Sequence, residues 1–263
     1  FEEEDILNLF EELFTSIVET IKPELRVIKP FPRLAYAEAM ECYGTDKPDL
    51  RFGLEIRDLS DIVAQSDFSI FRSAIAEGGK VKGICAPGCA AYTRRQLDEL
   101  NKLVQERGAK GLVTMSLGTS AGSLNNLTAG MVRSVAAKFL TLEQIKQMAE
   151  RLGAGMGDLL LIIADKPELA NAVLGELRCE MGHRLKLAEP NLFAFAFIVG
   201  FPLLQWNEET GYWETMHHPF TMPRDEDILL LDTAPGRAHG KHYDMVCNGC
   251  EVAGGSIRIY TAE

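Results

Sequence analysis

The middle of the chain alternates between strand-like and helix-like segments, and this alternation limits the fold more than any other feature. Two capping boxes, TRRQ from Thr93 and TLEQ from Thr141, each predict the start of a helix. Pro167 stands in the first turn of a further predicted helix. Strands are predicted over residues 68–75, 81–85, 112–117 and 159–164. We therefore expect a self-contained α+β module here.

The two ends of the chain differ from this module. Apolar residues recur at helical spacing from Glu3 to Ile21, which predicts an amphipathic helix whose apolar face needs a partner. From Phe193 to Ile259 the pattern favours strands. We expect the helix and these strands to share one core. The expected division is 1–56, 57–190 and 191–263, with the middle range inserted into a domain built from the other two.

Composition excludes several classes of protein. The chain has 263 residues, of which 46% are hydrophobic, so it can bury a substantial core. A formal net charge of −11 argues against nucleic-acid binding except through a local basic patch. No window approaches the ~18 consecutive apolar residues of a membrane span, so we expect a cytoplasmic protein without membrane contact. Six cysteines in a chain of this length are expected to be reduced thiols.

Four of the five histidines lie between His217 and His242. His239, His242, Cys247 and Cys250 contain the side chains of a four-ligand zinc site, but only four residues separate the two pairs. Zinc frameworks usually leave a dozen or more residues there, so we keep a zinc protein only as a weak alternative. For His217 and its neighbour, the alternative is a pair of surface or half-buried imidazoles, and at most one of them is expected to enter a given pocket.

Asp244, Glu251 and Arg258 are spaced seven residues apart. An odd spacing places strand residues on opposite faces, so convergence on one pocket requires a one-residue slip in each interval. The sequences Asn248-Gly249 and Ala253-Gly-Gly are of the types that allow such slips. Two convergent carboxylates would suit Mg²⁺ on a nucleotide phosphate, and an arginine would suit a carboxylate. The alternative is a charged strand that faces solvent.

Three blocks carry a resemblance to a known family. PRLAYAEAMECYGTDKPDLRFG (32–53), FPLLQWNEETGYWETMHHPFTMP (201–223) and HYDMVCNGCEVAGGSIRI (242–259) resemble bacterial-type aspartyl-tRNA synthetase, in that family's order. The middle module resembles the insertion of the bacterial enzymes, a fold shared with a tRNA-dependent amidotransferase. The resemblance implies an α+β chain with part of the antiparallel class II catalytic sheet and an inserted α+β domain.

The resemblance also implies an activity and site residues. The family activates L-aspartate with ATP and transfers it to tRNA, as an aspartate–tRNA ligase. By motif position, His217 would contact aspartate and Arg258 would bind its side-chain carboxylate. Glu251 would contact ATP through Mg²⁺, and Asp244 would be a second metal carboxylate. An arginine selects aspartate over asparagine because the neutral amide leaves a buried cation unpaired.

The sequence departs from the family in two ways. Cys250 replaces an aromatic residue and Ala253 replaces the first of three glycines. The two arginine motifs that clamp ATP do not occur, so the chain is expected to be an internal piece that is inactive alone. Full-length members are dimers, and the piece itself is expected as a monomer.

The alternative function is a docking module for tRNA or protein built on the inserted domain, with basic residues at positions 80, 82, 94, 95, 102, 107 and 110.

Overall fold

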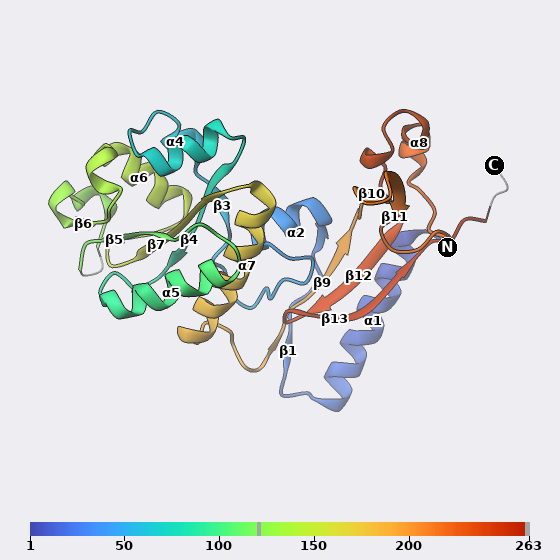
Figure 1. The fold of residues 1–263 in the computed structure, drawn as a ribbon. Helices are drawn as coiled ribbons and strands as arrows, with labels where there is room; N and C mark the ends of the chain where they lie inside the picture. The colour runs from blue at the N-terminus through green and yellow to red at the C-terminus, as the bar shows by residue number, and fades with distance from the viewer. Residues whose placement is uncertain (120–121, 261–263) are drawn as a thin grey trace. The chain divides into compact units, whose positions relative to one another are not determined.

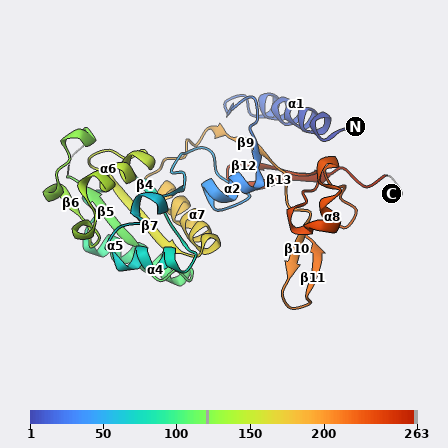
Figure 2. The same ribbon diagram turned by 90° about the horizontal axis from the view of Figure 1, so that it is seen from above.

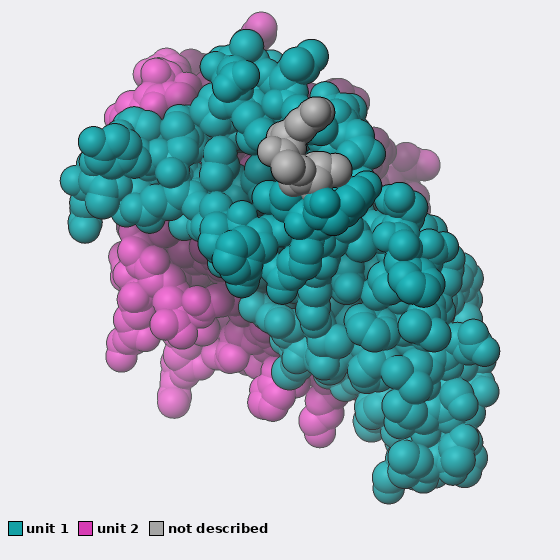
Figure 3. Space-filling model, turned by 90° about the vertical axis from the view of Figure 1, so that its right-hand side faces the viewer, with its two compact units in different colours: residues 1–39, 46–51, 189–263 teal, residues 40–45, 52–188 magenta. Residues whose placement is uncertain are grey.

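The computed structural model describes residues 1–119 and 122–260, which form two compact units. The two units are coloured separately in Figure 3. Within the described residues, unit 1 comprises 1–39, 46–51 and 189–260, and unit 2 comprises 40–45 with 52–119 and 122–188. The chain therefore passes between the units more often than the expected division at 56 and 190 implies, because residues 40–45 belong to unit 2 and residues 46–51 to unit 1.

Unit 2 is a five-stranded antiparallel sheet covered by helices on both faces. Its strand order is β3-β4-β7-β5-β6. The strands are β3 (Arg57–Asp58), β4 (Lys80–Ala86), β5 (Val113–Leu117), β6 (Val132–Arg133) and β7 (Leu159–Asp165). The helices are α3 (Ser60–Val63), α4 (Ser69–Ala76), α5 (Arg94–Glu106), α6 (Leu142–Arg151) and α7 (Pro167–Arg184).

Two apolar clusters separate the helices of unit 2 into layers. One cluster joins one face of the sheet to α4 and α6, and the other joins the opposite face to α5 and α7. The same arrangement is visible in Figure 1. The central strand β7 is buried along its whole length, since helices cover both of its faces.

The capping boxes are confirmed at both helices. Thr93 and Thr141 each accept a hydrogen bond from a backbone amide three residues later, and each Gln side chain accepts one in return. The strand predicted over 68–75 is wrong, because this segment is α4. Phe71 and Ala74 are its buried residues, and Phe68, the residue before the helix, is buried too; this spacing of three is helical. Its aromatic and β-branched side chains had suggested a strand.

Unit 1 contains a four-stranded sheet of order β13-β12-β9-β2. Its strands are β2 (Arg33–Ala35), β9 (Phe195–Val199), β12 (His242–Cys247) and β13 (Cys250–Ser256). The pairs β9–β12 and β12–β13 are antiparallel, and β2 joins β9 in parallel. Smaller elements are β1 (Arg26–Val27), β8 (Leu192–Phe193), β10 (Leu204–Asn207), β11 (Tyr212–Thr215) and α8 (Leu230–Thr233).

Helix α1 (Glu3–Ile21) packs on one face of this sheet, as expected from its apolar stripe. Figure 2 shows α1 on one side of β9, β12 and β13. The odd-numbered residues of β12 (Tyr243, Met245 and Cys247) lie in the cluster with α1. Val246 lies in a second cluster with Ala39 of α2 (Tyr36–Tyr43). The even-numbered residues of β12 therefore point to the face away from α1.

Within residues 1–119 and 122–260, the structure has no helix long and apolar enough to span a membrane.

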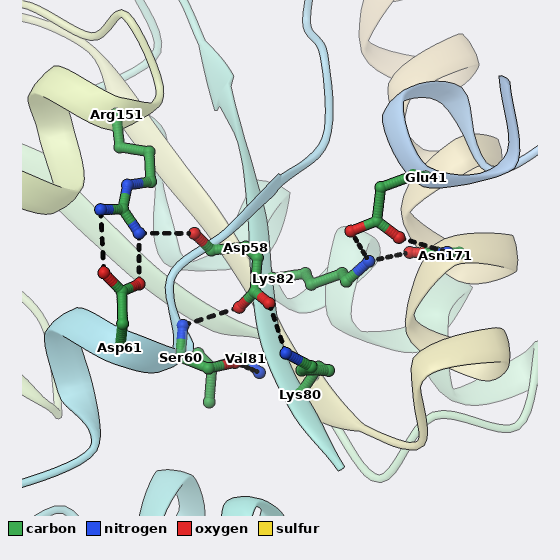
Figure 4. Close-up of polar contacts among 9 residues, drawn as sticks. All are labelled: Glu41, Asp58, Ser60, Asp61, Lys80, Val81, Lys82, Arg151 and Asn171. Atoms are coloured by element: carbon green, nitrogen blue, oxygen red, sulfur yellow. Dashed lines mark hydrogen bonds and ion pairs between the residues drawn. The ribbon is translucent and has the colours of Figure 1, made fainter. Parts of the chain in front are cut away.

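A buried lysine ties the end of α2 to the sheet of unit 2 (Figure 4). The Lys82 side chain is 2% exposed, and its ammonium lies 2.5 Å from Oε1 of Glu41 and 2.8 Å from Oδ1 of Asn171. A buried ammonium needs such partners, because its desolvation would otherwise be costly.

We expect Glu41→Ala to lower the free energy of unfolding of unit 2. The expected loss is about 2 kcal/mol, below the ~3–5 kcal/mol of fully buried pairs, because the Glu41 side chain is half exposed. Urea unfolding followed by far-UV circular dichroism measures the change. Glu38→Ala, at an exposed position of the same helix, is the matched control and is expected to change little. Equal effects of the two variants would contradict this account of Lys82.

Candidate active site on the β12–β13 hairpin

The hairpin of β12 and β13 turns at Asn248-Gly249. Both turn residues have positive φ, 52° and 86°, which is the geometry of a tight two-residue turn. Cys247 and Cys250 are therefore cross-strand partners. Burial raises the pKa of the Cys247 thiol to about 12, while Cys250 is exposed. The Asn248-Gly249 pair thus forms the hairpin turn. It does not form the one-residue slip between Asp244 and Glu251 that its sequence would also allow.

A slip in register occurs farther along β13. Met245 pairs with Ala253 and Val246 pairs with Glu251, so Val252 is an extra residue without a partner. Asp244 pairs with Gly254 on the other side of this bulge. Because Asp244 and Val246 share a face, the bulge brings Glu251 to the face of Asp244. The two side chains therefore share one face of the hairpin, as convergence requires, and a common pocket for them stays a prediction.

Gly254 separates the two carboxylates. A Cβ atom at Gly254 would lie 2.7 Å from Oδ1 of Asp244 and 3.5 Å from Oε1 of Glu251, so only glycine leaves space between them. Asp244 is buried, whereas the side chain of Glu251 is 43% exposed. Mg²⁺ is usually held by one or two carboxylates together with substrate phosphates. This pair, open on the side of Glu251, fits such an ion.

A loop of unit 1 adds a lysine to this face. Lys47 Nζ lies 3.2 Å from Oε2 of Glu251 and 3.7 Å from Oδ2 of Asp46. The hydrogen bond that Lys47 donates to Glu251 and the negative charge of Asp46 raise the pKa of Lys47, so the ammonium stays charged. Sequence reasoning assigned Lys47 no role. The available signal was its position in the charged GTDKPD loop.

His217 contacts His242, and His242 in turn contacts the carboxylate of Asp244. The ring of His217 stacks on His242 with 4.0 Å between centroids and 7° between planes. His242 Nε2 is 3.1 Å from Oδ1 of Asp244. Partial burial, together with the neighbouring His242, lowers the pKa of His217, although the residue as a whole is exposed. The Nδ1 atom of His218 accepts a hydrogen bond from the amide of Phe220.

Arg258 lies just after β13, where its backbone pairs with Thr221. This pairing places Arg258 alongside the segment that follows His217. Strand β13 ends at Ser256, two residues before Arg258. The Arg258 side chain is exposed and forms no ion pair within the described ranges 1–119 and 122–260. It is therefore open to an incoming carboxylate.

The four residues of the zinc alternative do not form a metal site. His239 Nδ1 bonds to Oδ2 of Asp227 at 2.7 Å, and His242 bonds to Asp244. Among the residues described, no group of three or more His, Cys, Asp or Glu side chains is placed to hold a metal ion.

The basic residues proposed for a docking module are paired with acids. Each of the seven has a carboxylate partner: Lys80 with Asp58, Lys82 with Glu41, Arg94 with Asp98, Arg95 with Glu99, Lys102 with Glu106, Arg107 with Glu176 and Lys110 with Glu77. These pairs neutralise the charge that phosphate binding would need, which disfavours nucleic-acid docking there.

Comparison with known proteins places the chain in a family. Residues 1–263 match the family model described as tRNA synthetases class II (D, K and N). The chain belongs to this class II synthetase family. It is 51% identical over 262 residues to an aspartate–tRNA(Asp/Asn) ligase of Dehalococcoides mccartyi strain CBDB1. This alignment covers 100% of the chain and 44% of the Dehalococcoides protein.

Two further relatives carry the same name. A protein of Moorella thermoacetica is 48% identical over 258 residues, and one of Rubrobacter xylanophilus is 45% identical over 258 residues. Each alignment covers 98% of this synthetase chain and 41% of the relative. The chain therefore spans less than half the length of the curated relatives it matches.

Proposed function

We propose that this chain is part of an aspartate–tRNA ligase, which activates L-aspartate with ATP and transfers the aspartyl group to tRNA in the cytoplasm. The family match and the names of the relatives support this assignment. We extend the acceptor named for the relatives, tRNA(Asp/Asn), to this protein. The observation that carries the proposal is the convergence of Asp244 and Glu251 over Gly254, next to His217.

Each site residue then has a proposed role. Asp244 and Glu251 hold Mg²⁺, which when bound neutralises and orients the phosphates of ATP. Lys47 adds a positive charge beside Glu251 for the same phosphates. His217, kept neutral by its lowered pKa, contacts the bound aspartate.

Arg258 is proposed to select aspartate. Its open guanidinium donates two parallel hydrogen bonds to the side-chain carboxylate, a geometry that an amide cannot match. Asparagine would leave the cation unpaired, which disfavours its binding.

The dimeric state of the full-length enzyme, and a monomeric state of this chain alone, remain predictions. So does the absence of adenylate formation by the isolated chain. Binding, and not turnover, is therefore the measurement that suits the 263-residue chain.

Arg258→Ala tests the proposal. We expect the wild-type chain to bind L-aspartate more tightly than L-asparagine in a calorimetric titration. The variant should bind aspartate about tenfold more weakly and lose the preference, because one charged contact contributes about 1.5–3 kcal/mol. Arg237→Ala, in a short loop helix of the same unit, is the matched control. An unchanged preference in Arg258→Ala would remove Arg258 from the site.

A further inference from the structure

His242 lies between the two halves of the proposed site. One face of its imidazole stacks on His217, with 4.0 Å between ring centroids. Its Nε2 lies 3.1 Å from Oδ1 of Asp244. The ring of His242 therefore contacts the residue proposed for aspartate and the residue proposed for Mg²⁺ at the same time.

The surroundings of His242 fix its ring. Phe201 meets the ring edge to face, with 4.8 Å between centroids and 89° between planes. The same phenyl ring meets His217 at 4.9 Å and 88°. The His242 side chain is 13% exposed, so its rotation would disturb these packed neighbours.

The strand geometry explains why His242 and Asp244 meet. They are two residues apart on β12, so both side chains point to the same face of the sheet. An ordered neighbour that donates a hydrogen bond to a metal-binding carboxylate fixes its orientation. The carboxylate then needs less ordering when the cation and the phosphates arrive.

We propose that His242 is a positioning residue that holds Asp244 through its Nε2–H group and His217 through its ring, and so couples the nucleotide half of the site to the amino-acid half. The inference rests on the proposed function, since the two ligands are those of aspartate activation. His242 itself touches neither ligand in this account.

Two substitutions separate the two contacts. His242→Phe keeps a flat ring under His217 but removes the donor to Asp244. His242→Gln keeps a polar side chain that reaches toward Asp244 but removes the ring. If His242 were needed only for folding, each variant would weaken the binding of both ligands to the same extent. If His242 is a positioning residue, each variant weakens the binding of a different ligand.

The experiment is calorimetric titration of the 263-residue chain with L-aspartate and, separately, with ATP and Mg²⁺. His242→Phe is expected to weaken ATP·Mg²⁺ binding about tenfold, the value of one hydrogen bond to a charged group, and to leave aspartate within about twofold. His242→Gln is expected to weaken aspartate binding about fivefold, in line with the loss of one aromatic contact, and to leave ATP·Mg²⁺ within about twofold. His183→Phe and His183→Gln, at an exposed position of α7, are the controls.

A second measurement needs no ligand. The ring of His242 should shift the imidazole proton resonances of His217 upfield in the NMR spectrum of the free chain. The shift should persist in His242→Phe and disappear in His242→Gln. Resonances of His217 that stay unchanged in His242→Gln would overturn the ring contact.

The outcomes distinguish the two proposals. A wild-type chain that binds neither ligand would count against the proposed function, and the NMR result would then decide for His242 alone. Wild-type binding together with equal losses in His242→Phe and His242→Gln would overturn the inference and leave the proposed function standing.

Discussion

Arg178→Ala is expected to lower the free energy of unfolding of unit 2 by about 4 kcal/mol, the largest stability effect of any variant considered. Arg178 lies on α7 with 0% exposure. Its Nε donates to the carbonyl of Gly53 at 3.0 Å, and its Nη2 donates to the carbonyl of Phe52 at 2.8 Å. Its guanidinium also lies 4.3 Å from the ring centroid of Phe52 and 4.9 Å from that of Tyr43.

The large expected loss has two causes, unpaired carbonyl groups and a cavity in the alanine variant. Two carbonyl groups would lose their donors, and the space of a fully buried side chain would be empty. Arg178→Lys keeps the charge but not the planar fork, and we expect it to lose about half as much.

Urea unfolding followed by far-UV circular dichroism measures the change. The fluorescence of Trp206 and Trp213 gives a separate signal for unit 1, where both tryptophans lie. Arg94→Ala makes the same chemical change on an exposed position of α5 and should stay within about 0.5 kcal/mol of wild type. A loss for Arg178→Ala no larger than that of the control would contradict the packing described here.

Asp244→Asn and Glu251→Gln are expected to give the largest effects on ligand binding. Each neutral variant should bind ATP·Mg²⁺ at least about tenfold more weakly, because a hard cation prefers charged oxygen ligands. Without Mg²⁺ the variants should bind ATP no worse than wild type, since the lost charges would no longer repel the phosphates. The double variant should lose less than the sum of the single losses, because both side chains serve one ion.

Glu208→Gln makes the same change as Glu251→Gln at an exposed position of unit 1 and is the control. Equal affinities for ATP·Mg²⁺ in the wild type and in both single variants would show that the convergence over Gly254 serves another purpose.

The local elements of unit 2 could largely be predicted from the sequence. Capping boxes at Thr93 and Thr141, and Pro167 at the start of α7, depend only on neighbouring residues. The segment 68–75 was assigned wrongly because a short apolar run fits a strand and a helix about equally well. Its burial at every third residue became clear only from the packed sheet.

The candidate site was partly predictable. The glycines after Glu251 indicated that the strand could slip, but the position of the bulge at Val252 depends on pairing with β12. The stack of His217 on His242 joins residues 25 positions apart in the chain, and Lys47 reaches Glu251 from a loop about 200 positions earlier. Such contacts follow from tertiary packing and have no local sequence signal, so His242 had been considered only as a zinc ligand.

The most direct test of the central claim is calorimetric titration of the wild-type chain with L-aspartate, with ATP·Mg²⁺, and with each in the presence of the other. The account predicts saturable binding of both ligands, with ATP·Mg²⁺ binding at least about tenfold weaker in Glu251→Gln and aspartate binding about tenfold weaker in Arg258→Ala. No heat of binding with either ligand, alone or together, would contradict the claim that these residues form an aspartate-activating site in this chain.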